Sequence, residues 1–250
     1  VRHARHLRME EIGVDGQARL SAAAVAVVGA GGLGCPVLLY LAAAGVGRLT
    51  VIDDDVVSLS NLQRQVIYRT EDVGRNKAEV AAQRVLDLDP NLDVHVHVTR
   101  LNPSNALALL KGHDLVIDGT DLIPARYLID DACALLDTPW IHASVHRFEG
   151  RLALFEPATG PSYRDLHPDA PPPGTVQACD EVGVLGAVPG VLGTMQAALA
   201  VEVLLGRGVD AKGRLTLVDV QALDVRHLAF QRLEGRASPT DLSCASRIWE

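Results

Sequence analysis

The glycine pattern Gly29-x-Gly31-x-x-Gly34 limits the possible folds of this chain more than any other feature of its sequence. It follows a short apolar run, residues 25–28, and precedes an apolar, alanine-rich stretch. Strand, glycine turn and helix in that order bring phosphates against the free amides of a helix N-terminus. A second apolar run ends in Asp53, whose carboxylate can accept hydrogen bonds from ribose hydroxyls. The pattern predicts a nucleotide site in a parallel βαβ unit.

Apolar runs and helical patterns alternate along the rest of the chain. Strands are predicted at 49–52, 94–98, 114–117, 140–144, 152–155 and 215–218, and helices at 75–88, 124–136 and 190–205. This alternation predicts an α/β fold with a doubly wound, mostly parallel, Rossmann-like sheet. Five prolines and glycines at 168–174 predict a long Pro-rich crossover loop over about 157–188. No linker divides the chain, so we expect one domain over 1–250 with an N-terminal arm at 1–20.

Charge and composition exclude several classes of partner. The formal net charge is −8, so nucleic acid and anionic membranes would repel most of the surface. No uninterrupted apolar run reaches the roughly 18 residues of a membrane span, and residues 1–20 mix Arg, His, Glu and Asp where a secretion signal would be apolar. The four cysteines form no CxxC pair, which indicates reduced thiols. We expect a soluble, cytoplasmic protein with no membrane or nucleic-acid partner.

Taken alone, the glycine pattern favours a Rossmann-type NAD-dependent oxidoreductase. Such an enzyme needs a proton relay beside the nicotinamide, and His142 and His146 are candidates for it. The strand pattern instead places these histidines at a strand end and in the turn that follows. The oxidoreductase therefore remains the alternative interpretation of the glycine pattern.

The residues after Asp53 add a more specific signal. Residues 53–65 read Asp-Asp-Asp-Val-Val-Ser-Leu-Ser-Asn-Leu-Gln-Arg-Gln, and residues 72–77 read Asp-Val-Gly-Arg-Asn-Lys. These strings resemble the D-x-D-x-V-x-x-S-N-L-x-R-Q and V-G-x-x-K signatures of the MoeB/ThiF family, bacterial relatives of ubiquitin-activating enzymes. The similarity runs from Arg5 to about Asp219 and includes residues 16–17, 118–121, 178–183 and 189–193.

The resemblance implies a role for each matching residue. Gly32 and Asp53 would hold the nucleotide and its ribose, Lys77 the α- to γ-phosphates, and Asp121 a magnesium ion bound with ATP. Arg5 would reach into the partner's site of a homodimer. The implied nucleotide-binding set is Gly29, Gly31, Gly32, Gly34, Asp53, Asp55, Ser60, Asn61, Leu62, Gln63, Arg64, Lys77, Asp121 and Leu122, and the implied catalytic set is Arg5, Arg64, Lys77, Asp121 and Cys179.

The resemblance also implies the reaction: ATP-dependent adenylation of the C-terminal Gly-Gly carboxylate of a ubiquitin-like sulfur-carrier protein, with or without a following sulfur-transfer step that involves a sulfurtransferase. A C-terminal carboxyl group has a pKa near 3.3–3.7, so at pH 7 it is already the nucleophile and needs no general base. The site must instead bring two anions together and stabilise the departing pyrophosphate, which is work for cations. Two other interpretations within the fold stay open, activation of a carboxylate on a modified tRNA base and a non-catalytic binding subunit.

Cys179 has two open interpretations. It stands where family members that transfer sulfur carry a cysteine able to form a covalent link to the carrier. The neighbouring Asp180 and Glu181 disfavour its thiolate and support an inert thiol instead. Cys35 and Cys133 lie in apolar helical stretches, so we expect them to be packing residues.

The chain departs from the family pattern in two places. Leu122 stands where an asparagine usually follows the metal-binding aspartate, which removes one polar contact. Most relatives also bind a structural zinc ion through two CxxC pairs, and this chain has Ser162-Tyr-Arg-Asp165 and Cys244-Ala-Ser-Arg247 at those places. Asp165, His167 and Cys244 make a poor substitute set for tetrahedral zinc, so we expect no structural zinc.

Overall fold

The computed structural model describes residues 2–157, 160–172 and 183–249. These residues form an eight-stranded sheet in the order β3-β2-β1-β4-β5-β6-β7-β8. The strands are β1 (Ala24–Val28), β2 (Arg48–Ile52), β3 (Asp93–His97), β4 (Leu115–Asp118), β5 (Trp140–His146), β6 (Glu149–Phe155), β7 (Arg214–Asp219) and β8 (Asp224–Ala229). β1 to β5 pair in parallel and β6 to β8 in antiparallel. The predicted α/β fold with a mostly parallel sheet is confirmed; β8 was not predicted.

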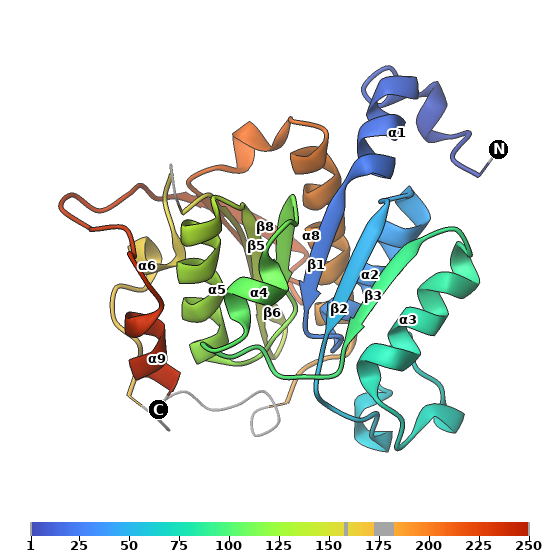
Figure 1. Ribbon diagram of the computed structural model, residues 1–250, viewed down its shortest axis with the longest axis horizontal. Helices are drawn as coiled ribbons and strands as arrows, with labels where there is room; N and C mark the ends of the chain where they lie inside the picture. The colour runs from blue at the N-terminus through green and yellow to red at the C-terminus, as the bar shows by residue number, and fades with distance from the viewer. Residues whose placement is uncertain (1, 158–159, 173–182, 250) are drawn as a thin grey trace.

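Helices cover both faces of this sheet. They are α1 (Gly13–Ala22), α2 (Gly34–Ala44), α3 (Lys77–Leu88), α4 (Ala106–Leu110), α5 (Ile123–Leu136), α6 (Tyr163–Leu166), α8 (Ala187–Leu204) and α9 (Ser243–Trp249), with 3-10 turns η1 (His6–Arg8), η2 (Leu59–Asn61), η3 (Thr70–Asp72) and η4 (Gly208–Ala211). α2, α3 and α8 share one buried apolar core, while α4, α5 and α9 share the other. Figure 1 shows α5 in front of the sheet and α8 behind it.

The register of the central strands sets the position of the site. β1 is apolar and buried along its whole length, as expected of a central strand covered on both faces. Its last residue, Val28, pairs with Ile52 of β2 and with Asp118 of β4. Because parallel strands end at one edge, the loops after β1, β2 and β4 meet there. The chain enters β1 from α1 at the opposite edge.

Helix α8 is the one described helix that is long and apolar enough to cross a membrane, with a mean hydropathy of 1.5 over 18 residues. It packs against α2 and against strands β5 and β6. Gln196, midway along it, is buried and donates to the backbone carbonyl of Asp118 over 2.8 Å. These contacts are typical of a core helix.

Two predicted segments contain more structure than the sequence indicated. The N-terminal arm holds η1 and α1, and Gln17 anchors it by donating to the Ala44 carbonyl at the end of α2 over 3.0 Å. Within the predicted crossover loop, residues 163–166 form α6 and α8 begins at Ala187. Residues 158–159 and 173–182 of that loop lie outside the described residues.

Candidate functional site

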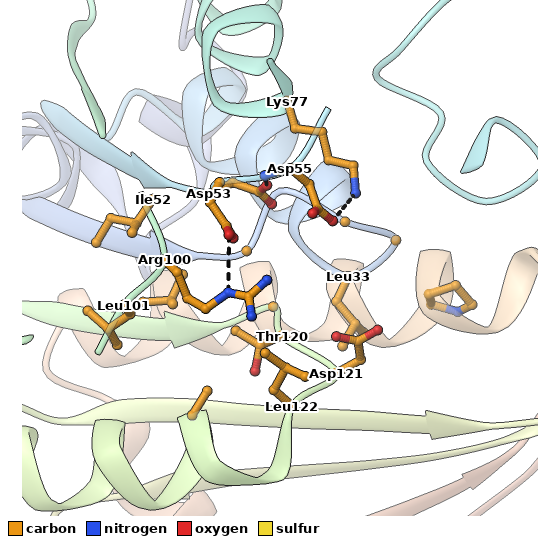
Figure 2. A pocket seen from close by; sticks show the side chains of 18 of the residues that line it. Leu33, Ile52, Asp53, Asp55, Lys77, Arg100, Leu101, Thr120, Asp121 and Leu122 are labelled. Carbon is orange, nitrogen blue, oxygen red and sulfur yellow. Dashed lines mark hydrogen bonds and ion pairs between the residues drawn. The ribbon is translucent and has the colours of Figure 1, made fainter. Parts of the chain in front are cut away.

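A pocket of about 330 Å³ opens where the loops after β1, β2 and β4 meet. Figure 2 shows Asp53, Asp55 and Lys77 on one side of it, and Thr120, Asp121 and Leu122 on the other. The lining includes, from the predicted set, Gly29, Gly31, Gly32, Asp53, Asp55, Asn61, Arg64, Lys77, Asp121 and Leu122. The structure therefore brings most of the predicted nucleotide-binding residues to one cavity.

The glycines make the tight turn between β1 and α2 possible. Gly29 has φ +91°, a conformation that side chains disfavour. A Cβ on Gly34 would lie 2.0 Å from the Gly29 carbonyl oxygen, so no side chain fits at that position. Gly34 does not line the pocket: it lets the first turn of α2 close against the glycine loop.

Asp53 braces the glycine loop. Its Oδ2 accepts a hydrogen bond from the Ala30 amide over 2.7 Å, and its Oδ1 accepts one from the Asp55 amide over 2.8 Å. Burial raises the pKa of Asp53, and the two amides and Lys77 oppose that rise. Each carboxylate oxygen keeps a second lone pair for a ribose hydroxyl.

Lys77 is the buried cation of the pocket. Only 5% of the residue is exposed, and its Nζ lies 2.9 Å from Oδ2 of Asp55, whose side chain is 62% exposed. The Tyr68 hydroxyl lies 2.7 Å from the Ala30 carbonyl oxygen and 3.2 Å from that of Lys77, so it joins the glycine loop to the start of α3. Tyr68 lies outside the predicted set, because no polar motif in the sequence marks it.

Two further arginines enter the pocket that the sequence analysis did not single out. Arg100 follows β3 at the same sheet edge and pairs with Asp54 over 3.1 Å. Arg126 lies in the first turn of α5, and its Nε is 3.7 Å from Oδ2 of Asp118. A signal for Arg100 existed, because it follows the carboxyl end of a parallel strand.

Several predicted residues lie away from this pocket. Among the described residues, Ser60, Leu62 and Gln63 are not part of its lining. Arg5 is exposed and precedes α1, on the segment that packs at the end of α2 remote from the glycine loop. An 11-residue helix spans about 16 Å, so Arg5 does not reach the pocket of its own chain. Cys179 lies outside the described residues.

Asp121 has the surroundings that a magnesium ligand needs. Its carboxylate is exposed to the pocket, and in the described part of the chain no group donates a hydrogen bond to it. Carboxylates with one or two free oxygens and a nearby phosphate are the usual magnesium ligands. The exposed Leu122 beside it offers no ligand atom.

A buried polar layer lies behind the pocket. His142 Nδ1 donates to Oδ2 of Asp118 over 2.9 Å, while the Thr120 amide and hydroxyl donate to Oδ1 over 2.9 and 2.7 Å. Burial lowers the pKa of His142 to about 4 against the opposing effect of Asp118, so the imidazole is neutral at pH 7. Both His142 and His146 belong to β5, which extends beyond the predicted strand end. His142 is enclosed and does not line the pocket.

Residues 162–165, at one of the two places where the resemblance would put zinc ligands, do not fit that metal. Ser162 caps α6, and Asp165 accepts hydrogen bonds from the Ser162 and Leu233 amides over 2.7 and 2.9 Å and pairs with Arg236 over 2.6 Å. The described residues contain no group of three metal-binding side chains. Asp165 thus holds α6 to the segment after β8 through hydrogen bonds, and its oxygens are occupied.

Family resemblance and structural similarity agree with this geometry. The ThiF family matches residues 3–241. The chain is 47% identical to a sulfur carrier protein adenylyltransferase of Thermus thermophilus, covering 92% of this chain and 87% of that protein. It is 45% identical to the SAMP-activating enzyme E1 of Haloferax volcanii, over 95% of this chain and 86% of that protein. It is 44% identical to the probable adenylyltransferase/sulfurtransferase MoeZ of Mycobacterium tuberculosis, over 96% of this chain and 62% of that protein.

Solved structures support the fold alone. The crystal structure of E. coli MccB with succinimide matches with a TM-score of 0.81 at 20% identity, over 95% of this chain and 73% of that one. A second MccB structure, with MccA-N7isoASN, gives 0.83 at 21% identity. The match over residues 3–241 and the identities above 40% show that this chain belongs to the ThiF family.

Proposed function

We propose that this chain is an adenylyltransferase that uses ATP to activate the C-terminal carboxylate of a ubiquitin-like sulfur-carrier protein. The observation that carries the proposal is the set of cations beside the glycine loop, in a pocket whose described lining contains no histidine. Arg64, Lys77 and Arg100 line the pocket, and His142 is buried behind it. Such a site suits transfer of an adenylyl group from ATP, because its cations can stabilise the charge on the leaving pyrophosphate, and family membership favours this reaction over the NAD-dependent alternative.

The reaction is a displacement at phosphorus. One carboxylate oxygen forms a bond to the α-phosphorus of ATP, and the bond from that phosphorus to the oxygen bridging the β-phosphate breaks. The electron pair leaves with pyrophosphate, no proton moves, and the products are an acyl-adenylate and pyrophosphate. The carboxylate is ionised at pH 7, so the protein's task is orientation and charge stabilisation.

The proposed roles follow from where the residues lie. Asp53 receives the ribose, and the amides of the glycine loop face the phosphates. Lys77 and Arg64 stabilise the triphosphate, on which negative charge grows as pyrophosphate leaves. A magnesium ion held by Asp121 and the phosphates would add charge neutralisation and orientation when bound.

Carrier-dependent exchange of pyrophosphate into ATP tests this proposal directly. Lys77→Ala and Arg64→Ala should each lower exchange by at least about 100-fold, as loss of a group that stabilises transition-state charge does elsewhere. The matched control is Arg69→Ala, a 65%-exposed arginine side chain near the same segment that does not line the pocket. Near-normal exchange in the Lys77 and Arg64 variants would refute the assignment.

A sulfur-transfer step after adenylation is a separate proposal, and it depends on Cys179. Adenylation uses only the phosphate-site cations, whereas covalent capture of the carrier needs a thiolate. On this proposal, Cys179→Ser keeps exchange within a few fold of the wild-type rate and removes any thiol-sensitive carrier–enzyme conjugate seen on a non-reducing gel. An active carrier that yields no such conjugate with wild-type enzyme and a sulfur source would leave adenylation as the whole activity.

A further inference from the structure

A second cavity of about 1220 Å³ adjoins the nucleotide pocket. It lies between the first turn of α5, the antiparallel strands β6 to β8, and α9. The two cavities share six lining residues, Asp121, Leu122, Arg126, Ser144, Val145 and Trp249. These six residues are called the junction below.

Trp249 is the largest side chain of the junction, and it comes from an element far away in the sequence. α9 packs beside α5 (Figure 1). Its Ala245 and the preceding Leu242 are buried in the apolar core that includes α5, and Trp249 packs onto the same core. Its neighbour Ile248 lines only the second cavity. The indole therefore forms one wall of the junction, with Leu122 and Arg126 of the α5 side among the other walls.

Arg126 is the cation of the junction, which also contains the carboxylate of Asp121. Its Nε is buried, donates no hydrogen bond to a described group, and forms an ion pair with the Asp118 carboxylate over 3.7 Å. The side chain is 13% exposed, and a guanidinium carries five N–H groups, so groups other than the buried Nε can donate to a passing carboxylate or peptide carbonyl. An anionic chain end that moves from the second cavity toward the glycine loop passes this group.

We propose that Trp249 is a specificity-determining residue, which restricts the junction to a chain end without side chains at its last two positions. The inference rests on the proposed function, because a carrier carboxylate must cross the junction to reach the α-phosphorus of ATP. A methyl group on either terminal residue would meet the indole, whereas a Gly-Gly end presents backbone alone.

The test compares two forms of a ubiquitin-like sulfur-carrier protein that supports exchange by the wild-type enzyme, one ending in Gly-Gly and one in Gly-Ala. Wild-type enzyme should prefer the Gly-Gly form in kcat/KM by roughly 10- to 200-fold, the range for one excluded carbon group. Trp249→Ala should reduce that preference to about threefold or less, because the methyl then has room. Ile248→Ala, the matched control on the same helix, should keep the wild-type preference.

Each outcome decides between the two proposals. An unchanged preference in a Trp249→Ala enzyme that still turns over the Gly-Gly carrier would overturn the inference and leave adenylation intact. If the alanine variant melts at a much lower temperature, Trp249→Leu is measured in its place, because leucine is smaller than tryptophan but can still pack on the apolar core. Wild-type enzyme that exchanges with no Gly-Gly carrier would overturn the proposed function, and the inference with it.

Discussion

Two buried titratable groups behind the nucleotide pocket should act on stability in opposite directions between pH 7 and pH 5. Burial lowers the pKa of His142 to about 4, and burial raises the pKa of Asp130 to about 6. Asp130 lies in α5, where it accepts hydrogen bonds from the Trp140 indole over 3.1 Å and the Tyr163 amide over 3.0 Å. Both groups are enclosed, so each pKa shift bears on the free energy of unfolding.

The signs follow from counting protons. Below pH 6.5 unfolded chains protonate His142 and folded chains do not, so stability falls as the pH falls from 6.5 toward 4. Folded chains protonate Asp130 below about pH 6 and unfolded chains only near 3.8, so stability rises as the pH falls through that interval. Between pH 7 and pH 5, His142 removes about 2 kcal/mol and Asp130 adds about 1 kcal/mol, so they largely offset each other.

Thermal melts of His142→Asn and Asp130→Asn at pH 7 and pH 5 separate the two effects. Relative to wild type, His142→Asn should gain stability on acidification and Asp130→Asn should lose it. The two variants should diverge by about 3 kcal/mol, or about 6–12 °C in the shift of Tm for a chain of this size. Asparagine keeps an amide donor for Asp118 and an oxygen acceptor for Trp140 while removing each titration.

Comparing pH shifts within one variant cancels the fixed cost of the substitution. Burial also lowers the pKa of His113 and His167, but both residues are present in both variants. Parallel pH profiles for the two variants would refute the inference that His142 and Asp130 change the stability in opposite directions on acidification.

Three further predictions concern the glycine loop, the α6 tether and the partner subunit. Gly34→Ala places a Cβ 2.0 Å from the Gly29 carbonyl and should abolish nucleotide binding, measured by titration with ATP; wild-type affinity would refute the packing argument. Asp165→Asn should lower the unfolding free energy by about 3–5 kcal/mol in urea, because Arg236 loses its buried charge partner, and an unchanged midpoint would contradict this role. Arg5→Ala and Asp121→Ala chains should each lack exchange activity, yet regain part of it when mixed, if a homodimer shares its sites; no recovery after demonstrated subunit exchange would contradict that.

The sequence predicted the parallel half of the fold well because its strands carry strong local patterns. The apolar run at 25–28 and the glycine turn predict a strand followed by a helix, and the structure confirms both. Asp53, Lys77 and Asp121 line the cavity beside that turn. The antiparallel half was harder. β8 is largely exposed and carries charged and polar residues among apolar ones, so no buried-strand pattern marks Asp224–Ala229.

Residues that act through tertiary contacts were the ones missed. Tyr68 and Arg126 belong to no local motif, and only the fold brings them to the glycine loop and the pocket. Trp249 lies beyond residues 215–218, the last segment predicted from the sequence, on the short helix α9, whose position depends on packing against α5. For Ser60 and Gln63 the opposite holds: the family resemblance implied that they surround the phosphates, but neither lines the pocket.

The position of the pocket follows from strand order more than from any single motif. The chain builds β1, β2 and β3 toward one side and then crosses to β4 and β5 on the other, so the order reverses between β1 and β4. The loops after these two strands touch at their base, where a Cβ on Gly29 would lie 2.8 Å from the Gly119 carbonyl, and then leave in opposite directions. A crevice must open between them. The glycine pattern locates one wall of this crevice from sequence, but the other wall, with Asp121 and Leu122, is placed there only by the crossover.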